Sequence, residues 1–522
     1  MYLASNIKLN IDFNKDNLST IISNKFKLNK DLICDIKLQK LSLDARNKSD
    51  IKYIASISFD YKKSLNISKF KNLTIFKEIK SIPIVANNFN KKVIIVGSGP
   101  SGLFSALEFL RSGVKVTILE RGYEMSKRQK AVDNLFTNGI LDEKSNIQFG
   151  EGGAGTFSDG KLNSGIKSEF VSYVLNTFHK FGAGENICYD FRPHVGTDVL
   201  SKVIVNIRNY LIENGCEVLF EHRVKEIEIS GDKVTGVIVE TSNGDVLVPC
   251  DILLMGIGHS SRDTIRMLYD KGLEITQKPF SMGVRIEHLA KDINFAQYGE
   301  MAHKNILPTA DYHLSEKLEN GRVVYTFCMC PGGVVVPAMS ESGTIVTNGM
   351  SYNARDGVNS NSAVLVNVNV EDFESSHPLA GIEFQEMYEK KAFKNGCPTV
   401  QRFEDFLNGV PSKKLGKVVP SIKPKYVLGD VSEMLPHFVV TSLKDGILKL
   451  NKKLKCFADG DSILTGIESR SSAPYQVKRD EKMQTSISGL YMIGEGAGFA
   501  GGIVSSAVDG IKVSRQILNE NN

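Results

Sequence analysis

A short apolar run followed by three closely spaced glycines constrains this chain more than any other feature. Val93-Ile-Ile-Val96 is rich in β-branched residues, which is typical of a buried parallel strand. Gly97, Gly99 and Gly102 follow at once, and apolar residues then recur at helical spacing as far as Gly113. A second apolar run at 114–119 completes a β-α-β unit. The pattern predicts an α/β protein with a Rossmann-type parallel sheet.

The spacing of these glycines indicates what the unit binds. Gly97 allows a tight turn, Gly99 lets the backbone approach a pyrophosphate, and Gly102 lets the helix pack close to the strand. The unpaired N–H groups at the helix start then face the phosphates. Glu120 ends the next strand, where an acidic side chain can accept hydrogen bonds from ribose hydroxyls. The motif therefore predicts a dinucleotide site, although it does not by itself distinguish NAD from FAD.

Three later segments favour FAD. A dense glycine segment at 150–160 can wrap an extended dinucleotide and lie against a flat ring. Arg223-Val224 begins a strand that would pass the adenine. Near the C-terminus, the strand Leu490–Ile493 leads into Gly494-Glu495, and Gly501-Gly502-Ile503 opens a final helix.

The C-terminal segment resembles the second FAD signature of flavin oxidoreductases related to glutathione reductase. In that signature an acidic residue binds the ribityl chain, and this chain has Glu495 where aspartate is commoner. The final helix would direct its N–H groups at the flavin, which stabilises the anionic reduced ring. We find no second glycine motif for a separate NAD(P)H domain, so NAD(P)H is only one candidate electron donor.

We accordingly predict a single FAD-binding site assembled from distant parts of the chain. Its expected residues are Gly97, Gly99, Pro100, Ser101, Gly102, Glu120, Arg121, Gly153, Gly155, Thr156, Lys161, Val224, Gly258, Gly494, Glu495, Gly501, Gly502 and Ile503.

The chain divides into four predicted segments. Residues 1–90 form a small N-terminal α+β domain that ends in a linker at 81–90, and residues 91–280 form the first part of the FAD-binding domain. Within the latter, an antiparallel meander is expected through 218–248. Residues 281–455 form an inserted mixed α+β cap or substrate domain, and residues 456–522 complete the FAD-binding domain.

Two segments supply candidate catalytic residues. Cys328 and Cys330 precede a glycine turn; they are either two small buried residues or a thiol pair near the flavin, and a disulfide between them would be strained. Arg470 lies in a polar loop at 468–474, where it either holds an anion at the flavin or pairs with Glu468 on a solvated loop. The isolated histidines, His194, His259 and His437, are expected to be structural, and no metal-ligand cluster is expected.

Several of these segments resemble those of bacterial uncharacterised FAD-dependent dehydrogenases. They are 151–161, 328–333, 348–351, 377–382 and 468–474, and the resemblance extends over residues 30 to 520. The resemblance implies a non-covalently bound FAD and an N-terminal accessory domain. It implies no substrate, because the family is assigned mainly by its cofactor.

Composition sets the remaining expectations. The eight cysteines are scattered, and no apolar run reaches the roughly 18 residues of a membrane helix, so a cytoplasmic protein without a membrane partner is expected. Residues 1–90 contain 16 lysines and arginines against 8 aspartates and glutamates.

The main hypothesis is an FAD-dependent oxidoreductase that acts on a small molecule or electron carrier. The basic N-terminal segment leaves open a flavin-dependent RNA-modifying or RNA-binding protein, although we expect no nucleic-acid partner. A flavin redox sensor without turnover is a further alternative.

Overall fold

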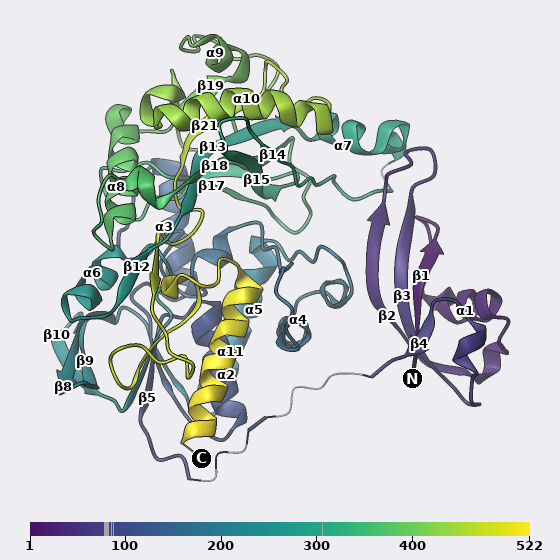
Figure 1. Ribbon diagram of the computed structural model, residues 1–522, viewed down its shortest axis with the longest axis horizontal. Helices are drawn as coiled ribbons and strands as arrows, with labels where there is room; N and C mark the ends of the chain where they lie inside the picture. The colour runs from purple at the N-terminus through teal and green to yellow at the C-terminus, as the bar shows by residue number, and fades with distance from the viewer. Residues whose placement is uncertain (78–82, 85, 87, 305, 522) are drawn as a thin grey trace.

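The computed structural model describes residues 1–77, 83–84, 86, 88–304 and 306–521. The chain forms three units, each with its own sheet and apolar core (Figure 1). In this view the N-terminal unit lies at the right, the central unit at the lower left and the second unit above the central one. Parts of the predicted linker, residues 81, 82, 85 and 87, lie outside the described residues.

The central unit is built on a five-stranded parallel sheet. Its strands are, in spatial order, β23 (Leu490–Met492), β11 (Ile252–Met255), β5 (Val93–Val96), β6 (Thr117–Leu119) and β7 (Glu217–Leu219). All residues of β5 and β11 are buried, as expected for parallel strands covered on both faces. Strand β7 belongs to this sheet, so the prediction that the antiparallel meander begins at 218 is wrong. Its few residues carry no signal that separates a parallel from an antiparallel partner.

The meander itself follows β7 in the chain. It consists of β8 (Arg223–Ser230), β9 (Lys233–Thr241) and β10 (Gly244–Pro249), in the order β10-β9-β8. The helices of the central unit are α2 (Pro100–Arg111), α3 (Met125–Asn138), α4 (Phe170–Lys180), α5 (Thr197–Glu213), α6 (Arg262–Asp270) and α11 (Ile503–Glu520).

Helices α2 and α11 lie side by side in Figure 1, although they are distant in sequence. The contact is close because a Cβ atom at Gly510 of α11 would lie 2.3 Å from the carbonyl oxygen of Ser101 in α2. Glycine at this position lets the first and last helices of the unit meet backbone to backbone, which fixes both helix starts at one end of the sheet.

The second unit contains a seven-stranded sheet. Its order is β14 (Ser315–Lys317), β15 (Val323–Cys330), β18 (Asn359–Val368), β13 (Phe280–Leu289), β21 (Ile463–Glu468), β19 (Thr399–Arg402) and β20 (Val427–Leu428). Strand β21 follows residue 455, the predicted end of the insertion, and it pairs with β13 from the start of the insertion. The division into domains remains a proposal.

Helices and short strands surround the second sheet. The helices are α7 (Ala290–Tyr298), α8 (Ala380–Ala392), α9 (Phe403–Asn408) and α10 (His437–Lys453). Strands β16 (Val334–Pro337) and β17 (Thr347–Met350) form a separate pair beside this sheet, and a further pair, β12 (Ile275–Gln277) with β22 (Tyr475–Val477), packs into the core of the central unit. Helix α10 packs on β13, β15 and β18 (Figure 1).

The N-terminal unit is a four-stranded sheet with one helix on it. Its strands, in the order β2-β3-β1-β4, are β2 (Ile33–Asp44), β3 (Lys52–Tyr61), β1 (Tyr2–Leu9) and β4 (Leu73–Ile75), and its helix is α1 (Leu18–Phe26). The predicted fold class is confirmed: a Rossmann-type α/β unit, a mixed unit and a small α+β unit.

The N-terminal unit contacts the central unit through backbone atoms. Leu41 of β2 donates its N–H to the carbonyl of Tyr189 at 2.7 Å and accepts from the N–H of Phe191 at 2.8 Å. The tip of the β2–β3 hairpin also reaches α7, where the Lys48 ammonium donates to the carbonyl of Ala296 at 2.7 Å. Among the described residues, none of the helices combines the length and apolar character needed to cross a bilayer.

We predict that Gly510→Ala destabilises the protein although alanine favours helix by about 1 kcal/mol over glycine. The added Cβ would force α11 away from α2, at a cost of about 1–3 kcal/mol. Thermal unfolding followed by circular dichroism measures the effect, with Lys512→Ala on the exposed side of α11 as the control. A higher unfolding temperature for Gly510→Ala would contradict the close helix contact.

Candidate functional site

A cavity of about 720 Å³ lies between the parallel sheet and the seven-stranded sheet. Val96 and Gly97 line it at the carboxyl end of β5, and Cys328 and Glu468 line it from β15 and β21. Its volume falls in the range of about 300–1,000 Å³ that is typical of ligand sites. Open α/β sheets bind their ligands at the carboxyl ends of their strands, so this cavity is the candidate site.

The glycines at the start of α2 have separate steric roles. Gly97 has a φ of +96°, and a Cβ there would lie 2.4 Å from the carbonyl oxygen of Gly256. A Cβ at Gly102 would lie 2.0 Å from the carbonyl oxygen of Gly97, so this residue fixes the close packing of helix and strand. A Cβ at Gly99 would meet only Gly153, at 3.8 Å. The fold therefore requires glycine at 97 and 102, whereas glycine at 99 keeps cavity space open.

The predicted glycine segment contacts both helix starts. Gly153 has a φ of +65°, and a Cβ there would lie 3.1 Å from the Cα of Gly99 at the start of α2. A Cβ at Gly155 would lie 2.9 Å from the side chain of Ile503 at the start of α11. The segment thus joins the two helix N-termini, more than 400 residues apart in the chain, into one continuous cavity wall.

A fully buried arginine holds this segment in place. Arg128 of α3 donates from Nη1 to the carbonyls of Gly150, Glu151 and Gly153 at 3.2, 2.6 and 3.0 Å. Nε and Nη2 donate to the carbonyls of Asn146 and Ile147 at 3.0 and 2.8 Å. Burial lowers the pKa of Arg128 to about 10. Its guanidinium therefore remains charged at neutral pH and satisfies carbonyls that the irregular backbone leaves without helix or sheet partners.

Glu120 lies at the end of β6, as the sequence predicts. One carboxylate oxygen accepts from the N–H and the hydroxyl of Ser98 at 2.9 and 2.8 Å. The other accepts from the N–H groups of Gly122 and Gly150 at 2.9 and 3.1 Å. Glu120 thus ties the α2 turn to the glycine segment. All four of its usual acceptor positions are filled by protein groups, so its contact with a ribose stays a prediction.

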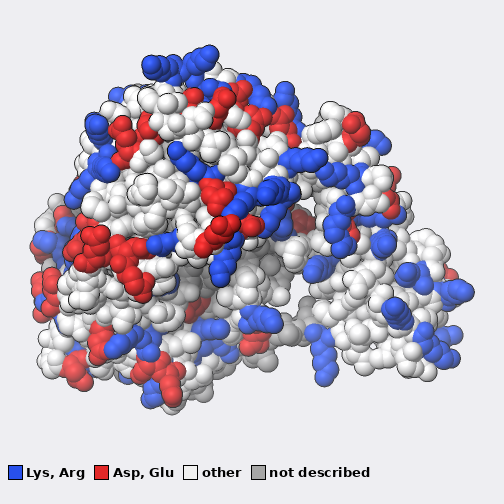
Figure 2. Space-filling model, turned by 45° about the horizontal axis from the view of Figure 1, so that its top comes forward, with Lys and Arg blue, Asp and Glu red and all other residues white. Residues whose placement is uncertain are grey.

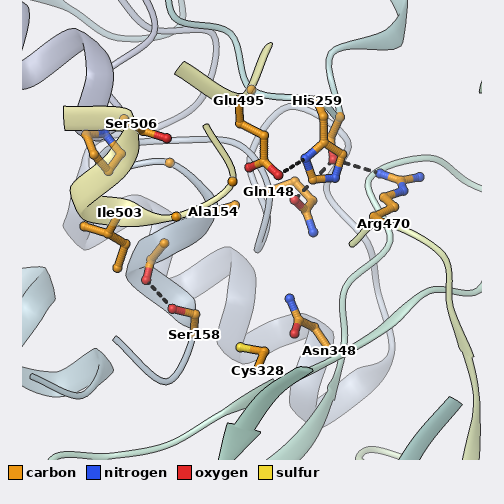
Figure 3. A pocket seen from close by; sticks show the side chains of 18 of the residues that line it. Gln148, Ala154, Ser158, His259, Cys328, Asn348, Arg470, Glu495, Ile503 and Ser506 are labelled. Carbon is orange, nitrogen blue, oxygen red and sulfur yellow. Dashed lines mark hydrogen bonds and ion pairs between the residues drawn. The ribbon is translucent and has the colours of Figure 1, made fainter. Parts of the chain in front are cut away.

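The second helix start presents another acidic group. Gly501 and Gly502 precede α11 and line the cavity with Ile503. Nearby, Glu495 Oε1 lies 3.2 Å from Nδ1 of His259, and the buried Nε2 of His259 has no hydrogen-bond partner among the described residues. Figure 3 shows the two side chains facing one another at the cavity wall. His259 therefore belongs to the candidate site, which its isolated position in the sequence did not indicate.

Arg470 is buried in an ionic network. Its guanidinium donates to the two carboxylate oxygens of Glu389 at 3.1 and 2.8 Å, and Arg262 binds the same carboxylate at 2.8 and 2.9 Å. Burial opposes the charge on Glu389, but the two guanidinium groups lower its pKa well below the ordinary value. The alternative that Arg470 pairs with Glu468 on a solvated loop is wrong, because both residues are buried and Glu468 pairs with Arg285 at 2.8 Å. Arg470 nonetheless lines the cavity, next to Ser260 and Ser340.

The two cysteines have different surroundings. Cys328 lines the cavity and has a φ of +43°, whereas Cys330 is fully buried and outside the lining. Both are free thiols, and the Cys330 thiol donates to the carbonyl oxygen of Cys328 at 3.2 Å. The cavity therefore meets one of the two sulfur atoms.

Most of the predicted site residues gather at the cavity. Those that line it are Gly97, Gly99, Pro100, Ser101, Glu120, Arg121, Gly153, Gly155, Lys161, Val224, Gly258, Cys328, Arg470, Glu495, Gly501, Gly502 and Ile503. Those outside the lining are Gly102, Thr156, Cys330 and Gly494. Gly102 and Gly494 pack against the turns that shape the cavity, and the N–H of Gly494 binds Asp509 at 2.8 Å.

The sequence interpretation missed the buried charges that support this wall. Arg128, Arg285, Glu389 and Asp159 all bind partners distant in sequence, so no local motif marks them. Within the described part of the chain, no group of three or more His, Cys, Asp or Glu side chains could hold a metal ion.

Three family models match successive parts of the chain. Residues 92–254 match "FAD dependent oxidoreductase", residues 279–471 match "FAD-dependent protein, C-terminal domain-like", and residues 1–60 match a domain of unknown function. An uncharacterized protein of Clostridium beijerinckii is 44% identical over 529 residues, which cover 99% of this chain and 98% of that protein.

Solved structures give remoter likenesses. A geranylgeranyl bacteriochlorophyll reductase-like protein of Thermoplasma acidophilum is 12% identical with a TM-score of 0.37, over 82% of this chain and 78% of its own. The myxobacterial chondrochloren halogenase is 11% identical with a TM-score of 0.38, over 83% and 73%. The FrdA chain of E. coli quinol fumarate reductase is 12% identical with a TM-score of 0.37, over 83% and 70%.

We predict that Arg128→Lys destabilises the central unit by about 3 kcal/mol, because a lysine cannot satisfy the same set of carbonyls and leaves several unpaired. Chemical denaturation measures the loss, with Arg266→Lys as the control, since Arg266 is partly exposed and pairs with Glu386. If the two variants lost the same stability, Arg128 would not have the structural role assigned to it.

Proposed function

The chain belongs to the FAD-dependent oxidoreductases, in a family that includes uncharacterised bacterial proteins, and from this premise we propose that its bound flavin exchanges a hydride with a small molecule in the cavity. FAD is the cofactor. We further propose that FAD is held without a covalent bond, with its pyrophosphate at the start of α2 and its flavin toward the start of α11.

The fit of the residues to FAD supports this placement. Gly99 leaves backbone exposed to the cavity at a helix start, and the next N–H groups in the helix can bind a pyrophosphate without a side chain intervening. At Gly153 and Gly155 the wall between the two helix starts carries no side chain. The single observation that carries the proposal is this continuous wall, because it suits an extended molecule with phosphates at one end and a ring at the other.

The chain would contribute binding and electrostatics, while bound FAD supplies the hydride chemistry. The start of α11 carries positive helix-dipole charge, and Glu495 with His259 occupies the nearby wall. The far wall presents Cys328 and Glu468 from the seven-stranded sheet, and Asn348 from the neighbouring strand β17. We therefore place the substrate between the flavin and this far wall.

The expected behaviour can be tested with purified protein under anaerobic conditions. The protein should be yellow with one FAD per chain, and a screen of NADH, NADPH and small organic donors should find one that bleaches the flavin absorbance. Gly99→Val should fold with an unchanged circular dichroism spectrum but retain at least ten-fold less FAD. Gly343→Asn, at an exposed turn outside the cavity lining, is the control.

The two rival functions predict other outcomes. Failure of every donor to bleach a fully loaded flavin would favour a redox sensor without turnover. Lys and Arg side chains are prominent on the N-terminal unit, at the right of Figure 2. Steeply salt-dependent RNA binding, lost on removal of residues 1–90, would favour the RNA-linked alternative.

A further inference from the structure

A β-bulge directs Cys328 into the cavity. Pairing of β15 with β18 is regular up to Phe327 and resumes at Cys330, with an irregularity between them. Cys328 has a left-handed φ of +43°, which a non-glycine residue seldom adopts. Bulges often reorient a side chain next to an active site. Here the backbone departs from regular strand geometry at the residue whose sulfur meets the cavity (Figure 3).

Three cationic side chains lie around Cys328. Arg285 of β13, fully buried, donates from both Nη1 and Nη2 to the carbonyl oxygen of Cys328, at 3.0 Å each. The Lys161 ammonium lies in the cavity wall and pairs with Asp159 at 2.9 Å; its remaining N–H groups have no partner in the described parts of the chain. Arg355 also lines the cavity, and its Nη2 donates to the carboxylate of Asp159 at 2.6 Å.

The charged side chains around Cys328 carry a net positive charge, which favours the binding of an anion. Among the described residues, Asp159 and Glu468 are the carboxyl groups that face the three cations, and Glu468 pairs with Arg285 at 2.8 Å. Three cations against two carboxyl groups leave an excess of positive charge, and burial raises the pKa of Glu468 although Arg285 opposes the rise. Burial lowers the pKa of His194, near Asp159, to about 4, so this ring is neutral. Positive charge consequently exceeds negative charge around the Cys328 sulfur.

These neighbours lower the pKa of the Cys328 thiol. The neighbouring Cys330 side chain lowers the pKa of Cys328 most, and Lys161 and Arg285 lower it further, whereas burial and Asp159 raise it. The pKa of Cys330 is raised by burial and by its neighbour. One sulfur of the pair is thus stabilised as a thiolate at the cavity surface while the other keeps its proton.

The same cavity contains polar groups without protein partners. The side chain of His259 is nine-tenths buried, and its Nε2 has no partner among the described residues. The amide of Asn348 accepts through its oxygen from the N–H of Gly349 at 2.7 Å, which leaves its nitrogen as a donor on the cavity side, near Cys328 in Figure 3. A buried polar atom without a partner costs free energy, so Nε2 of His259 points to a polar ligand in the cavity, and the Asn348 amide offers it a further donor.

We propose that Cys328 is a catalytic nucleophile, and that its substrate is a small carboxylate with an electrophilic carbonyl carbon, whose carboxylate is bound by Lys161 and Arg355. This inference rests on the proposed function in placing the substrate at the far wall. The sulfur forms a C–S bond to the carbonyl carbon, and the π electron pair moves to the carbonyl oxygen. That oxygen takes up the proton that the Cys328 thiol has lost and accepts a hydrogen bond from Asn348. No oxidant or reductant is consumed in this addition.

Competition between two alkylating probes tests the inference on the purified, flavin-loaded protein. Iodoacetate carries a carboxylate and iodoacetamide does not, and peptide mass spectrometry reports the labelling rate of each cysteine. We expect the ratio of iodoacetate to iodoacetamide labelling at Cys328 to exceed the ratio at the partly exposed Cys34 at least ten-fold. We also expect labelling of Cys328 to persist at lower pH than that of Cys34.

Matched variants separate the anion site from general reactivity. Lys161→Gln should bring the ratio at Cys328 close to that at Cys34, whereas Lys144→Gln, an exposed lysine outside the lining, should leave it unchanged. Equal ratios at the two cysteines in the unmodified protein, or an unlabelled Cys328, would overturn the inference. Flavin absorbance of the same samples distinguishes the two proposals: a yellow protein with an unreactive Cys328 contradicts only the nucleophile, and a colourless protein with a reactive Cys328 contradicts only the FAD site.

Discussion

The guanidinium of Arg128 is the interaction on which the site depends. It is fully buried and binds carbonyls of five residues between Asn146 and Gly153. Such a segment cannot be buried as regular structure, because its positive-φ glycines interrupt both helix and strand. The arginine supplies the donors that the backbone lacks. The segment can then lie against the starts of α2 and α11 and make one wall from three distant parts of the chain.

The opposite wall depends on buried ion pairs, within the second unit and between it and α6 of the central unit. Arg262 and Arg470 bind Glu389 of α8 from both sides, and Arg285 joins β13 to Glu468 of β21. A buried ion pair contributes little net stability but strongly penalises the loss of one partner, so these networks fix relative positions more than they add free energy. They hold the seven-stranded sheet over the carboxyl ends of the parallel strands. The cavity is consequently bounded by residues of both sheets.

Sequence reasoning found the parts of this site that have local causes. Gly97 has a left-handed φ in the turn, and Gly102 packs against the carbonyl of Gly97. Gly99 lies between them and faces the cavity, so the spacing within six residues identifies all three. Arg128 and Glu389 were missed because their partners lie elsewhere in the chain and their side chains look like ordinary helix surface. The alternative that Arg470 pairs with Glu468 failed for the same reason: Glu468 is two residues away in sequence, but it pairs with Arg285 of the neighbouring strand β13. The role of β21 in the second sheet was likewise hidden, since a strand's sheet is decided by pairing and not by its own residues.

The central claim is that both helix starts bind one extended molecule, and a titration of two flavins into flavin-free protein tests it most directly. FAD and FMN share the ring and ribityl phosphate, but only FAD carries the adenosine half that would reach Glu120 and Val224. Calorimetry should find one FAD per chain, bound at least a hundred-fold more tightly than FMN, a difference of about 2.7 kcal/mol. Equal affinities for FAD and FMN, or no binding of either, would contradict this account.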